Sequence, residues 1–319
     1  MRLGLLSTAQ INEKLVAGAR VVDDVDVVAV ASRDRGRAER QASALGIGTA
    51  HGSYEALLAD TDVDAVYISL PNSMHVDWSI QALEAGKHVL CEKPLAGSSE
   101  PVERAFDAAE SAGRVLAEAF MWRHHPQAKL LVELLPRVGR LRLVRTAFSF
   151  PLERSDDVRL SHELGGGSLM DVGCYCVSGA RLVAGEPLEA LGREVVGGDG
   201  VDVRFTGALR FSRDVLGHFD CGLDMPDRHE LEVVGSDGSL FVGDPWQSRE
   251  PVIEIRNADG STERVEAEAD DPYACELRDF AAAVSGEREP LLGRADAVGQ
   301  ARTIAALYES ASSGQVIAV

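Results

Sequence analysis

One lysine lies where a charged side chain could take part in chemistry. The segment Cys91-Glu92-Lys93-Pro94-Leu95 includes the end of an apolar run that is typical of a buried strand. A lysine at the carboxyl end of a strand can donate to a substrate oxygen and stabilise the charge that develops there. The proline makes Lys93–Pro94 a candidate cis peptide. Glu92 has two interpretations, since it either orients Lys93 or is an acid at a helix entry.

A carboxylate and a phenol follow a glycine-rich segment. Residues 165–175 read GGGSLMDVGCY, and three glycines let the backbone pass close to a neighbouring group before a helix begins. Asp171 and Tyr175 are four residues apart and would share one helix face. A nearby Lys93 ammonium would lower the pKa of Tyr175, which could then exchange a proton with a substrate hydroxyl. The alternative is a buried helix with two satisfied polar groups.

The first predicted strand, 2–6, runs into a turn of small residues. Ser7 and Ala9 stand where a dinucleotide-binding turn usually has glycine. The next helix, 10–21, would offer free N–H groups and its positive dipole end to a pyrophosphate. An ordinary strand–turn–helix is the alternative. The cofactor-binding residues predicted here are Gly4, Ser7, Thr8, Ala9, Gln10 and Ile11.

The end of the second predicted strand, 26–31, favours one form of the cofactor. It continues Ser32-Arg33-Asp34, and Arg37 lies close behind. A guanidinium and a hydroxyl suit a 2′-phosphate, whereas an NAD site usually carries an acid here. Ser32, Arg33 and Arg37 therefore predict NADP(H) rather than NAD(H). Asp34 leaves NAD(H) open, and solvated surface charge is the alternative for the arginines.

The end of the fourth predicted strand, 65–70, supplies further candidate contacts. Asn72 can cap the helix over 75–85, and the same position can face the nicotinamide ribose. Both roles can hold together. The cofactor-binding residues predicted from the fourth and fifth strand ends are Leu70, Pro71, Asn72, His75, Glu92 and Lys93.

The predicted strands and helices that must position these residues follow two different patterns along the chain. In the first part, strands alternate with helices of ten or more residues, which implies right-handed crossovers and a parallel sheet. Such sheets bind ligands outside the carboxyl ends of their strands. We predict a doubly wound Rossmann domain over 1–124, in which 65–70, 88–91 and 115–119 are the fourth, fifth and sixth strands.

The rest of the chain, 125–319, is predicted as an α+β domain. From about residue 140 the pattern becomes strand-like, with turn signals such as Ser236-Asp237-Gly238. We expect an open, mostly antiparallel sheet with helices on one face. The expected strands are 143–150, 202–211, 215–221, 230–234, 240–242 and 252–256, followed by a helical segment over 273–312.

Composition excludes several classes of partner. Acidic residues (51) outnumber basic ones (32), and the formal charge of −19 repels phosphate backbones and anionic lipid, so we expect no nucleic-acid or membrane partner. No apolar run is long enough for a membrane span, and the opening is interrupted too soon for a signal peptide, so a cytoplasmic location is expected. The five cysteines lack the spacing of a zinc clamp, and no metal is expected.

These motifs together resemble a known family. Glu92-Lys93-Pro94 followed by GGGSLMDVGCY is similar to the glucose–fructose oxidoreductase / inositol dehydrogenase (Gfo/Idh/MocA) family. Further matches are the opening GLLSTAQI, AFMWRHHPQ at 119–127 and YACELRDFAAAV near the carboxyl end, so the resemblance covers essentially the whole chain. It implies an open carboxyl-terminal sheet that faces a partner subunit, in a homodimer or homotetramer.

The resemblance also implies roles for individual residues. Lys93 would be the catalytic lysine, and Asp171 and Tyr175 would lie beside the substrate. Members similar to xylose dehydrogenase and dihydrodiol dehydrogenase carry tyrosine where inositol dehydrogenases carry histidine, so Tyr175 favours an aldose or keto-sugar over inositol. Arg123 and Arg159 would line the substrate cleft, with Arg123 also at the cofactor, or both are surface charges.

We therefore expect an NADP(H)-dependent oxidoreductase. It would transfer a hydride between nicotinamide and a CH–OH or C=O carbon of a sugar-like small molecule, as an aldose dehydrogenase or keto-sugar reductase. Two alternatives stay open. One is a catalytically silent, cofactor-binding regulator, and the other is an enzyme in which oxidation starts an elimination or glycoside cleavage with a recycled cofactor.

Overall fold

The computed structural model describes residues 1–154 and 156–319, and the chain forms two compact units. Unit 1 comprises residues 1–124 and 271–298, and unit 2 comprises residues 125–270 and 299–319. The segment 271–298, expected within 125–319, thus belongs to unit 1. The reason is close packing of helix α9 (Pro272–Val284) on α1 (Asn12–Ala19), since a Cβ on Gly18 would lie 2.8 Å from the nitrogen of Ala274.

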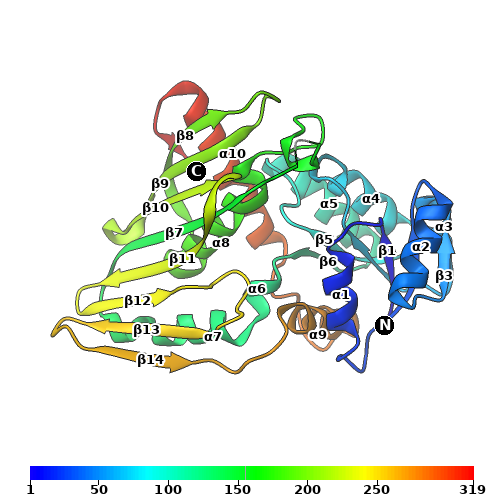
Figure 1. Ribbon diagram of the computed structural model, residues 1–319, viewed down its shortest axis with the longest axis horizontal. Coiled ribbons are helices and arrows are strands. Elements are labelled where there is room, and N and C mark those ends of the chain that lie inside the picture. The colour runs from blue at the N-terminus through cyan, green and yellow to red at the C-terminus, as the bar shows by residue number, and fades with distance from the viewer. Residues whose placement is uncertain (155) are drawn as a thin grey trace. The chain divides into compact units, whose positions relative to one another are not determined.

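Unit 1 is built on a six-stranded sheet of order β3-β2-β1-β4-β5-β6, in which every neighbouring pair is parallel (Figure 1). This confirms the predicted doubly wound fold, and the strand order reverses beside β1, where such sheets bind their ligands. The third strand, whose bounds the sequence pattern left open, has three residues. The strands are β1 (Arg2–Leu6), β2 (Asp26–Ala31), β3 (Thr49–His51), β4 (Ala65–Ile68), β5 (His88–Glu92) and β6 (Leu116–Ala119).

Helices cover both faces of this sheet, which is why its central strands are apolar throughout. All four residues of β4 are fully buried. Helix α1 begins two residues later than predicted, because residues 9–11 form a tight turn in which the N–H of Asn12 donates to Ala9 O at 3.2 Å. The other helices of unit 1 are α2 (Arg35–Leu45), α3 (Tyr54–Leu58), η1 (Asn72–Met74), α4 (His75–Glu84), α5 (Ser99–Ala112) and α6 (Met121–His124).

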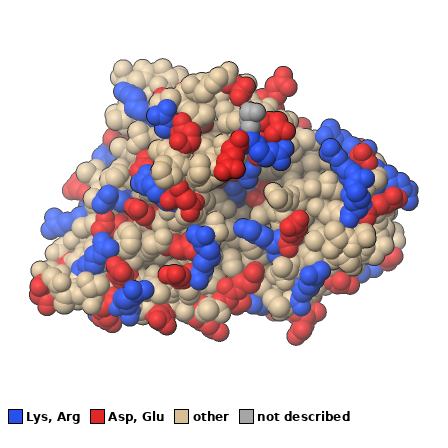
Figure 2. Space-filling view, in the orientation of Figure 1, with Lys and Arg blue, Asp and Glu red and all other residues tan. Residues whose placement is uncertain are grey.

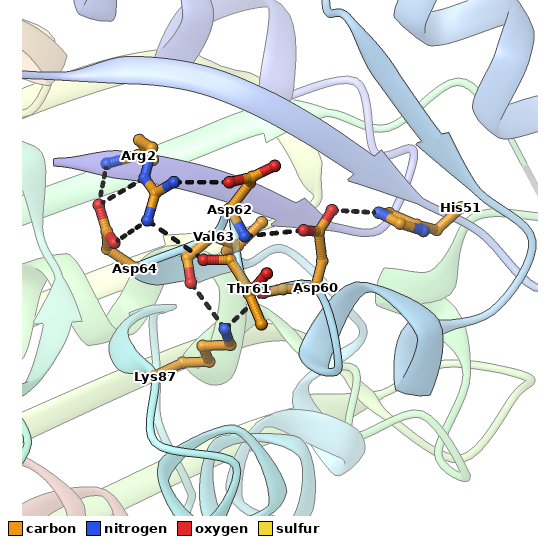
Figure 3. A network of polar contacts seen from close by, with 8 residues as sticks. All are labelled: Arg2, His51, Asp60, Thr61, Asp62, Val63, Asp64 and Lys87. Atoms are coloured by element: carbon orange, nitrogen blue, oxygen red, sulfur yellow. Dashed lines mark hydrogen bonds and ion pairs between the residues drawn. The ribbon is translucent and has the colours of Figure 1, made fainter.

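A polar network fixes the edge of this sheet that holds the amino ends of its strands (Figure 3). Arg2 donates to the carboxylate of Asp64 from its backbone N, Nε and Nη2, at 2.8, 3.2 and 2.8 Å. Lys87 is buried and donates to the carbonyls of Asp60 (2.6 Å) and Val63 (2.7 Å), and burial lowers its pKa. The network ties β1, β4 and β5 together and leaves their carboxyl ends for the site.

Unit 2 is built on a nine-stranded sheet of order β14-β13-β12-β11-β7-β10-β9-β8-β15. The pair β7–β10 is parallel and the other pairs are antiparallel, as predicted for a mostly antiparallel sheet. Strands β8, β14 and β15 had no counterpart in the predicted set. The strands are β7 (Leu141–Pro151), β8 (Pro187–Val196), β9 (Asp202–Phe211), β10 (Leu216–Gly222), β11 (Asp224–Gly235), β12 (Gly238–Val242), β13 (Val252–Asn257), β14 (Thr262–Glu266) and β15 (Ile317–Ala318).

Helices pack on one face of this sheet. A Cβ on Gly179 of α8 would lie 2.8 Å from Trp246, and a Cβ on Gly207 of β9 would lie 2.9 Å from Leu307 of α10, so small residues allow close approach. Strand β9 alternates buried and exposed residues, with Arg204 and Arg210 on its exposed face. The helices are α7 (Pro126–Leu134), η2 (Leu135–Val138), η3 (Val158–Leu160), η4 (Leu169–Gly173), α8 (Cys174–Ala184), η5 (Ser212–Asp214) and α10 (Arg294–Ser313), the last shared by both units.

The acidic excess is spread rather than gathered on the visible face. Figure 2 shows acidic and basic side chains interspersed there. Ion pairs join many acidic and basic side chains of the protein, such as Arg210 with Glu189 at 2.6 Å and Arg145 with Glu232 at 2.8 Å. This pattern is that of a solvated, mixed-charge surface.

Candidate active site

A buried hydrogen-bond network holds the turn after β1. Ser7 Oγ lies 2.7 Å from Ser69 Oγ and accepts a hydrogen bond from the N–H of Ala9 at 3.0 Å. The side chain of Asn12 donates to Ser7 O (2.9 Å) and Gln41 Oε1 (3.0 Å), and accepts from Ser69 Oγ (2.8 Å). Ser7 therefore replaces the usual glycine by using its hydroxyl to fasten the turn to the end of β4.

The amino end of α1 offers donors that fit an anionic group. The helix has no side-chain cap. Across residues 1–154 and 156–319, no acceptor is found for the N–H groups of Gln10 and Ile11. Unsatisfied N–H groups at the positive end of a helix suit a pyrophosphate. The half-buried Thr8 and Ala9 complete the predicted turn.

Gly4 has a packing explanation of its own. It lies inside β1, and a Cβ there would be 3.0 Å from the side chains of Leu57 and Val63. Close packing of α3 and the following loop against the strand accounts for this glycine. A direct contact of Gly4 with the cofactor stays a prediction.

The end of β2 gives Asp34 a structural role. Its carboxylate accepts from the N–H of Arg37 at 3.0 Å and caps α2. Ser32 is buried, and its hydroxyl accepts from the N–H of Asp34 at 3.2 Å. Arg33 and Arg37 are exposed at this strand end. The acid that left NAD(H) open is thus engaged as a helix cap, while guanidinium groups are available for a 2′-phosphate.

His75 ties together the ends of two neighbouring strands. It is fully buried, with Nε2 2.8 Å from Leu70 O and Nδ1 2.9 Å from Pro94 O. Burial lowers the pKa of His75, while the two carbonyls act in the opposite direction. The Lys93–Pro94 peptide is cis, as predicted. His75 therefore fixes the turn that carries Lys93 against the end of β4.

Asn72 does not stand at the N-cap position of α4. Helix α4 begins at His75, and its N-cap residue, Met74, makes no side-chain cap. Asn72 instead begins the short η1 turn that follows Pro71. Its contact with the nicotinamide ribose stays a prediction.

Glu92 holds the backbone of Lys93. The N–H of Lys93 donates to Glu92 Oε2 at 3.2 Å, and the hydroxyl of Tyr67 donates to Glu92 Oε1. Burial and the adjacent Glu92 raise the pKa of Tyr67 well above its usual value. These contacts support the orienting role of Glu92. Tyr67 was not among the predicted residues, and neither was a second buried carboxyl in unit 1.

That carboxyl is Glu276 of α9, which is 1% exposed. Across the described residues, its Oε1 has no hydrogen-bond partner. Burial, followed by the negative charge of Glu92, raises the pKa of Glu276 well above its usual value. Burial at this position therefore favours the neutral form of Glu276.

In unit 2, Asp171 is paired with a cation. Arg159 donates from Nε to Asp171 Oδ2 at 2.8 Å and from Nη1 to Asp157 Oδ1 at 3.1 Å. The charge of Asp171 is the main cause of the raised pKa of Arg159. The predicted residues Asp171 and Arg159 are therefore in direct contact.

The segment that carries Asp171 and Tyr175 differs from the predicted helix. Residues 169–173 (η4) form a π-helix, and the α-helix α8 begins at Cys174. Because π-helical bonds run from i to i+5, the angle between Asp171 and Tyr175 is not that of an α-helical pair. Tyr175 is buried, and its ring lies edge-on to Phe148 and Trp246, at 5.2 and 6.0 Å between centroids.

The structure thus brings the predicted residues together in two sets. Lys93 and Glu92 lie in unit 1, and Arg159, Asp171 and Tyr175 lie in unit 2. Arg123 is in α6 of unit 1, where its Nη1 is 3.5 Å from Asp296. Joint action of the two sets, and the contacts expected of Arg123, stay predictions.

The described residues form neither a candidate metal site nor a helix that could span a membrane. The five cysteines are buried, and within residues 1–154 and 156–319 no group of His, Cys, Asp or Glu could hold a metal ion. In the same part of the chain, every helix is too short or too polar to cross a membrane.

The fold and motifs are those of one family of enzymes. Residues 4–120 match the profile described as "Oxidoreductase family, NAD-binding Rossmann fold", and residues 136–241 match the "GFO/IDH/MocA C-terminal domain". The chain belongs to the Gfo/Idh/MocA oxidoreductase family, as the resemblance predicted. It is an NAD(P)-dependent oxidoreductase.

Two relatives in sequence and one solved structure are similar to nearly the whole chain. A D-xylose 1-dehydrogenase (NADP(+)) from Haloferax volcanii is 41% identical and covers 99% of both chains. A dTDP-3,4-didehydro-2,6-dideoxy-α-D-glucose 3-reductase from Actinomadura kijaniata is 34% identical and covers 98% of this chain and 96% of its own. The crystal structure of a 3-ketoreductase from the same organism, in complex with NADP and TDP-benzene, matches with a TM-score of 0.91 and 32% identity over 97% of each chain.

Proposed function

We propose that this protein is an NADP(H)-dependent sugar oxidoreductase that acts on a free aldose. The preference for NADP(H) over NAD(H) rests on the end of β2, where Arg33 is exposed and Asp34 is engaged as a helix cap. Tyr175 supports an aldose or keto-sugar, and the xylose dehydrogenase relative supports both the sugar and NADP. The relative's match over the whole chain makes an aldose the first substrate class to test.

The proposed chemistry is reversible hydride transfer. NADP(H), when bound, would supply the hydride chemistry, as acceptor in oxidation and donor in reduction. In the oxidative direction Tyr175 takes the proton of the substrate hydroxyl, and the Lys93 ammonium donates to the same oxygen. Glu92, which holds the backbone of Lys93, keeps that ammonium at the carboxyl end of β5. Asp171 and Arg159, already paired, orient neighbouring hydroxyls of the substrate.

The charges of one loop favour an uncharged sugar over a nucleotide-linked one. Arg154 pairs with Asp156 at 3.0 Å, and Arg159 pairs with Asp157 and Asp171. A nucleotide diphosphate carries several negative charges and binds best to cations without an acidic partner. The carboxylates beside these arginines lower the net positive charge that the loop offers to a nucleotide diphosphate. A dTDP-keto-sugar, the substrate in the name of the reductase relative, is the second candidate.

The proposal also covers the oligomeric state, the location, the partners and the alternative functions. A homodimer or homotetramer would form through the exposed face of the unit 2 sheet, whose β9 presents alternating exposed residues. The charge of −19 supports the proposal of no nucleic-acid or membrane partner. We also propose a cytoplasmic location. A silent regulator is disfavoured because Lys93 and Tyr175 are both present. Oxidation-initiated cleavage is the remaining alternative.

Initial rates test the proposal. Purified protein is assayed with NADP+ and D-xylose or D-glucose, and with NADPH and a dTDP-keto-sugar. We expect turnover of the aldose, loss of turnover in Lys93→Ala, and normal turnover in Lys129→Ala, an exposed lysine that pairs with Glu133. Turnover of the dTDP-keto-sugar alone would reverse the choice of substrate. Light scattering in solution measures the oligomeric state.

A further inference from the structure

A buried carboxylate in unit 2 accepts three hydrogen bonds near the predicted catalytic pair. Asp202, the first residue of β9, is 3% exposed. Its Oδ2 accepts from Ser168 Oγ at 2.6 Å and from the N–H of Leu169 at 2.7 Å, and its Oδ1 accepts from the hydroxyl of Tyr308 at 2.8 Å. A carboxylate with three donors around it is fixed in one orientation.

Two of these donors belong to the start of the segment that carries Asp171 and Tyr175. Leu169 is the first residue of η4, and no side chain of this segment caps it. The first N–H groups of a helix need an acceptor, and a carboxylate also complements the positive end of the helix dipole. Asp202 supplies that cap from a strand that begins 33 residues after Leu169. It therefore acts from outside the segment that it caps.

The glycine-rich run is built around the same carboxylate. Gly167 has φ of +125°, and a Cβ there would overlap Asp202 Oδ1 and lie 3.1 Å from the hydroxyl of Tyr308. Gly167 O in turn accepts from the N–H of Asp171 at 2.9 Å. The glycine thus lets Asp202 reach the first turn, and the next backbone contact leads directly to Asp171.

We propose that Asp202 is a positioning residue for Asp171 and Tyr175, and that Tyr308 of α10 locks it in place. The proposal rests on the proposed function, which assigns chemistry to Asp171 and Tyr175. Because catalytic groups that are misplaced by about 1 Å can lose activity by roughly 100-fold, loosening the first turn of η4 would be felt at the reacting atoms.

The perturbation is Asp202→Asn, which keeps the size of the side chain but turns a donor toward Ser168, Leu169 or Tyr308. A second variant, Tyr308→Phe, removes one hydrogen bond and keeps the ring, which packs edge-on to Phe205. Ser310→Ala is the matched control. Ser310 is a fully buried residue of the same helix, and its hydroxyl accepts from the N–H of Gly192 without contacting Asp202.

Three quantities are measured for each variant: kcat per folded molecule, the Kd of NADPH, and hydrogen–deuterium exchange of the peptide that spans 166–175. We expect Asp202→Asn to lower kcat by roughly 100-fold and Tyr308→Phe by about 10-fold. The Kd of NADPH should stay within about twofold, because the predicted cofactor residues lie in unit 1. Exchange over 166–175 should speed up in both variants, and Ser310→Ala should change neither kcat nor this exchange.

Two results would overturn the positioning role. One is unchanged exchange over 166–175 in Asp202→Asn, and the other is an equal loss of kcat in Asp202→Asn and Ser310→Ala at equal folded fraction. A wild-type protein that turns over no sugar would overturn the proposed function instead. In that case the exchange experiment would still decide whether Asp202 holds the segment.

Discussion

Replacing Arg33 with alanine tests the choice of cofactor directly. Arg33 is exposed at the end of β2, and the neighbouring carboxylate of Asp34 is occupied by the N–H of Arg37. A hydrogen bond between charged groups contributes about 1.5–3 kcal/mol, and exposure to solvent favours the lower half of that range. A loss of about 1.5–2 kcal/mol raises a dissociation constant roughly 10- to 30-fold. NADH has no 2′-phosphate, so its Kd should change less than about twofold.

The assay is a fluorescence titration of wild type and variants with NADPH and with NADH at one fixed salt concentration. Arg35→Ala is the control, because the guanidinium of Arg35 already pairs with Glu39 at 2.9 Å on the surface of α2. Higher salt should shrink the difference between wild type and Arg33→Ala, since solvent-exposed charges are screened. Equal losses for NADPH and NADH in Arg33→Ala, or tighter binding of NADH by wild type, would refute the argument.

Three further changes probe groups that the structure places around the site. Tyr67→Phe removes the donor to Glu92, and we expect kcat to fall about tenfold while the Kd of NADPH stays within about twofold, by steady-state kinetics and titration. Glu276→Gln should raise the free energy of unfolding by roughly 1–3 kcal/mol at pH 8 and little at pH 5. The raised pKa keeps the Glu276 carboxyl protonated in the folded protein, whereas in the unfolded protein it ionises above its ordinary pKa. The wild-type free energy of unfolding therefore falls as pH rises above that ordinary pKa. Equal urea midpoints for both proteins at pH 8 would contradict this. Asn12→Ala breaks three hydrogen bonds under the cofactor turn, and we expect a loss of about 2–4 kcal/mol in urea unfolding together with weaker NADPH binding.

The fold followed from the sequence wherever an element is long and regular. The β-branched run 26–31 is strand β2 with the predicted bounds, and 202–211 is β9 with the predicted bounds. The bounds of strand β3 could not be predicted because three residues are too few for a periodic signal. The return of 271–298 to unit 1 was missed as well, because helix periodicity does not say which neighbour a helix packs against.

The site was predictable only in part. Lys93 and Asp171 could be predicted as site residues because their neighbours in the sequence form recognisable motifs. Tyr67, Asn12 and Asp202 were not found, since each acts through a partner more than 20 residues away, and spacing carries no signal for such contacts. Asp34 shows the opposite case, because an acid that suits a ribose hydroxyl also suits a helix cap, and only the hydrogen bond to the N–H of Arg37 separates the two.

The route of the chain between the units has a consequence for how the protein is made. The chain leaves unit 1 after His124, returns at Asp271 and leaves again after Val298. A ribosome that has released only the first 124 residues has therefore not yet supplied α9, the helix that covers α1. The nucleotide-binding half must wait for almost the whole polypeptide, and a fragment cut at residue 124 should emerge with an uncovered apolar face and aggregate. A protein engineer who wants that half alone would have to join residues 1–124 to 271–298 in one new chain.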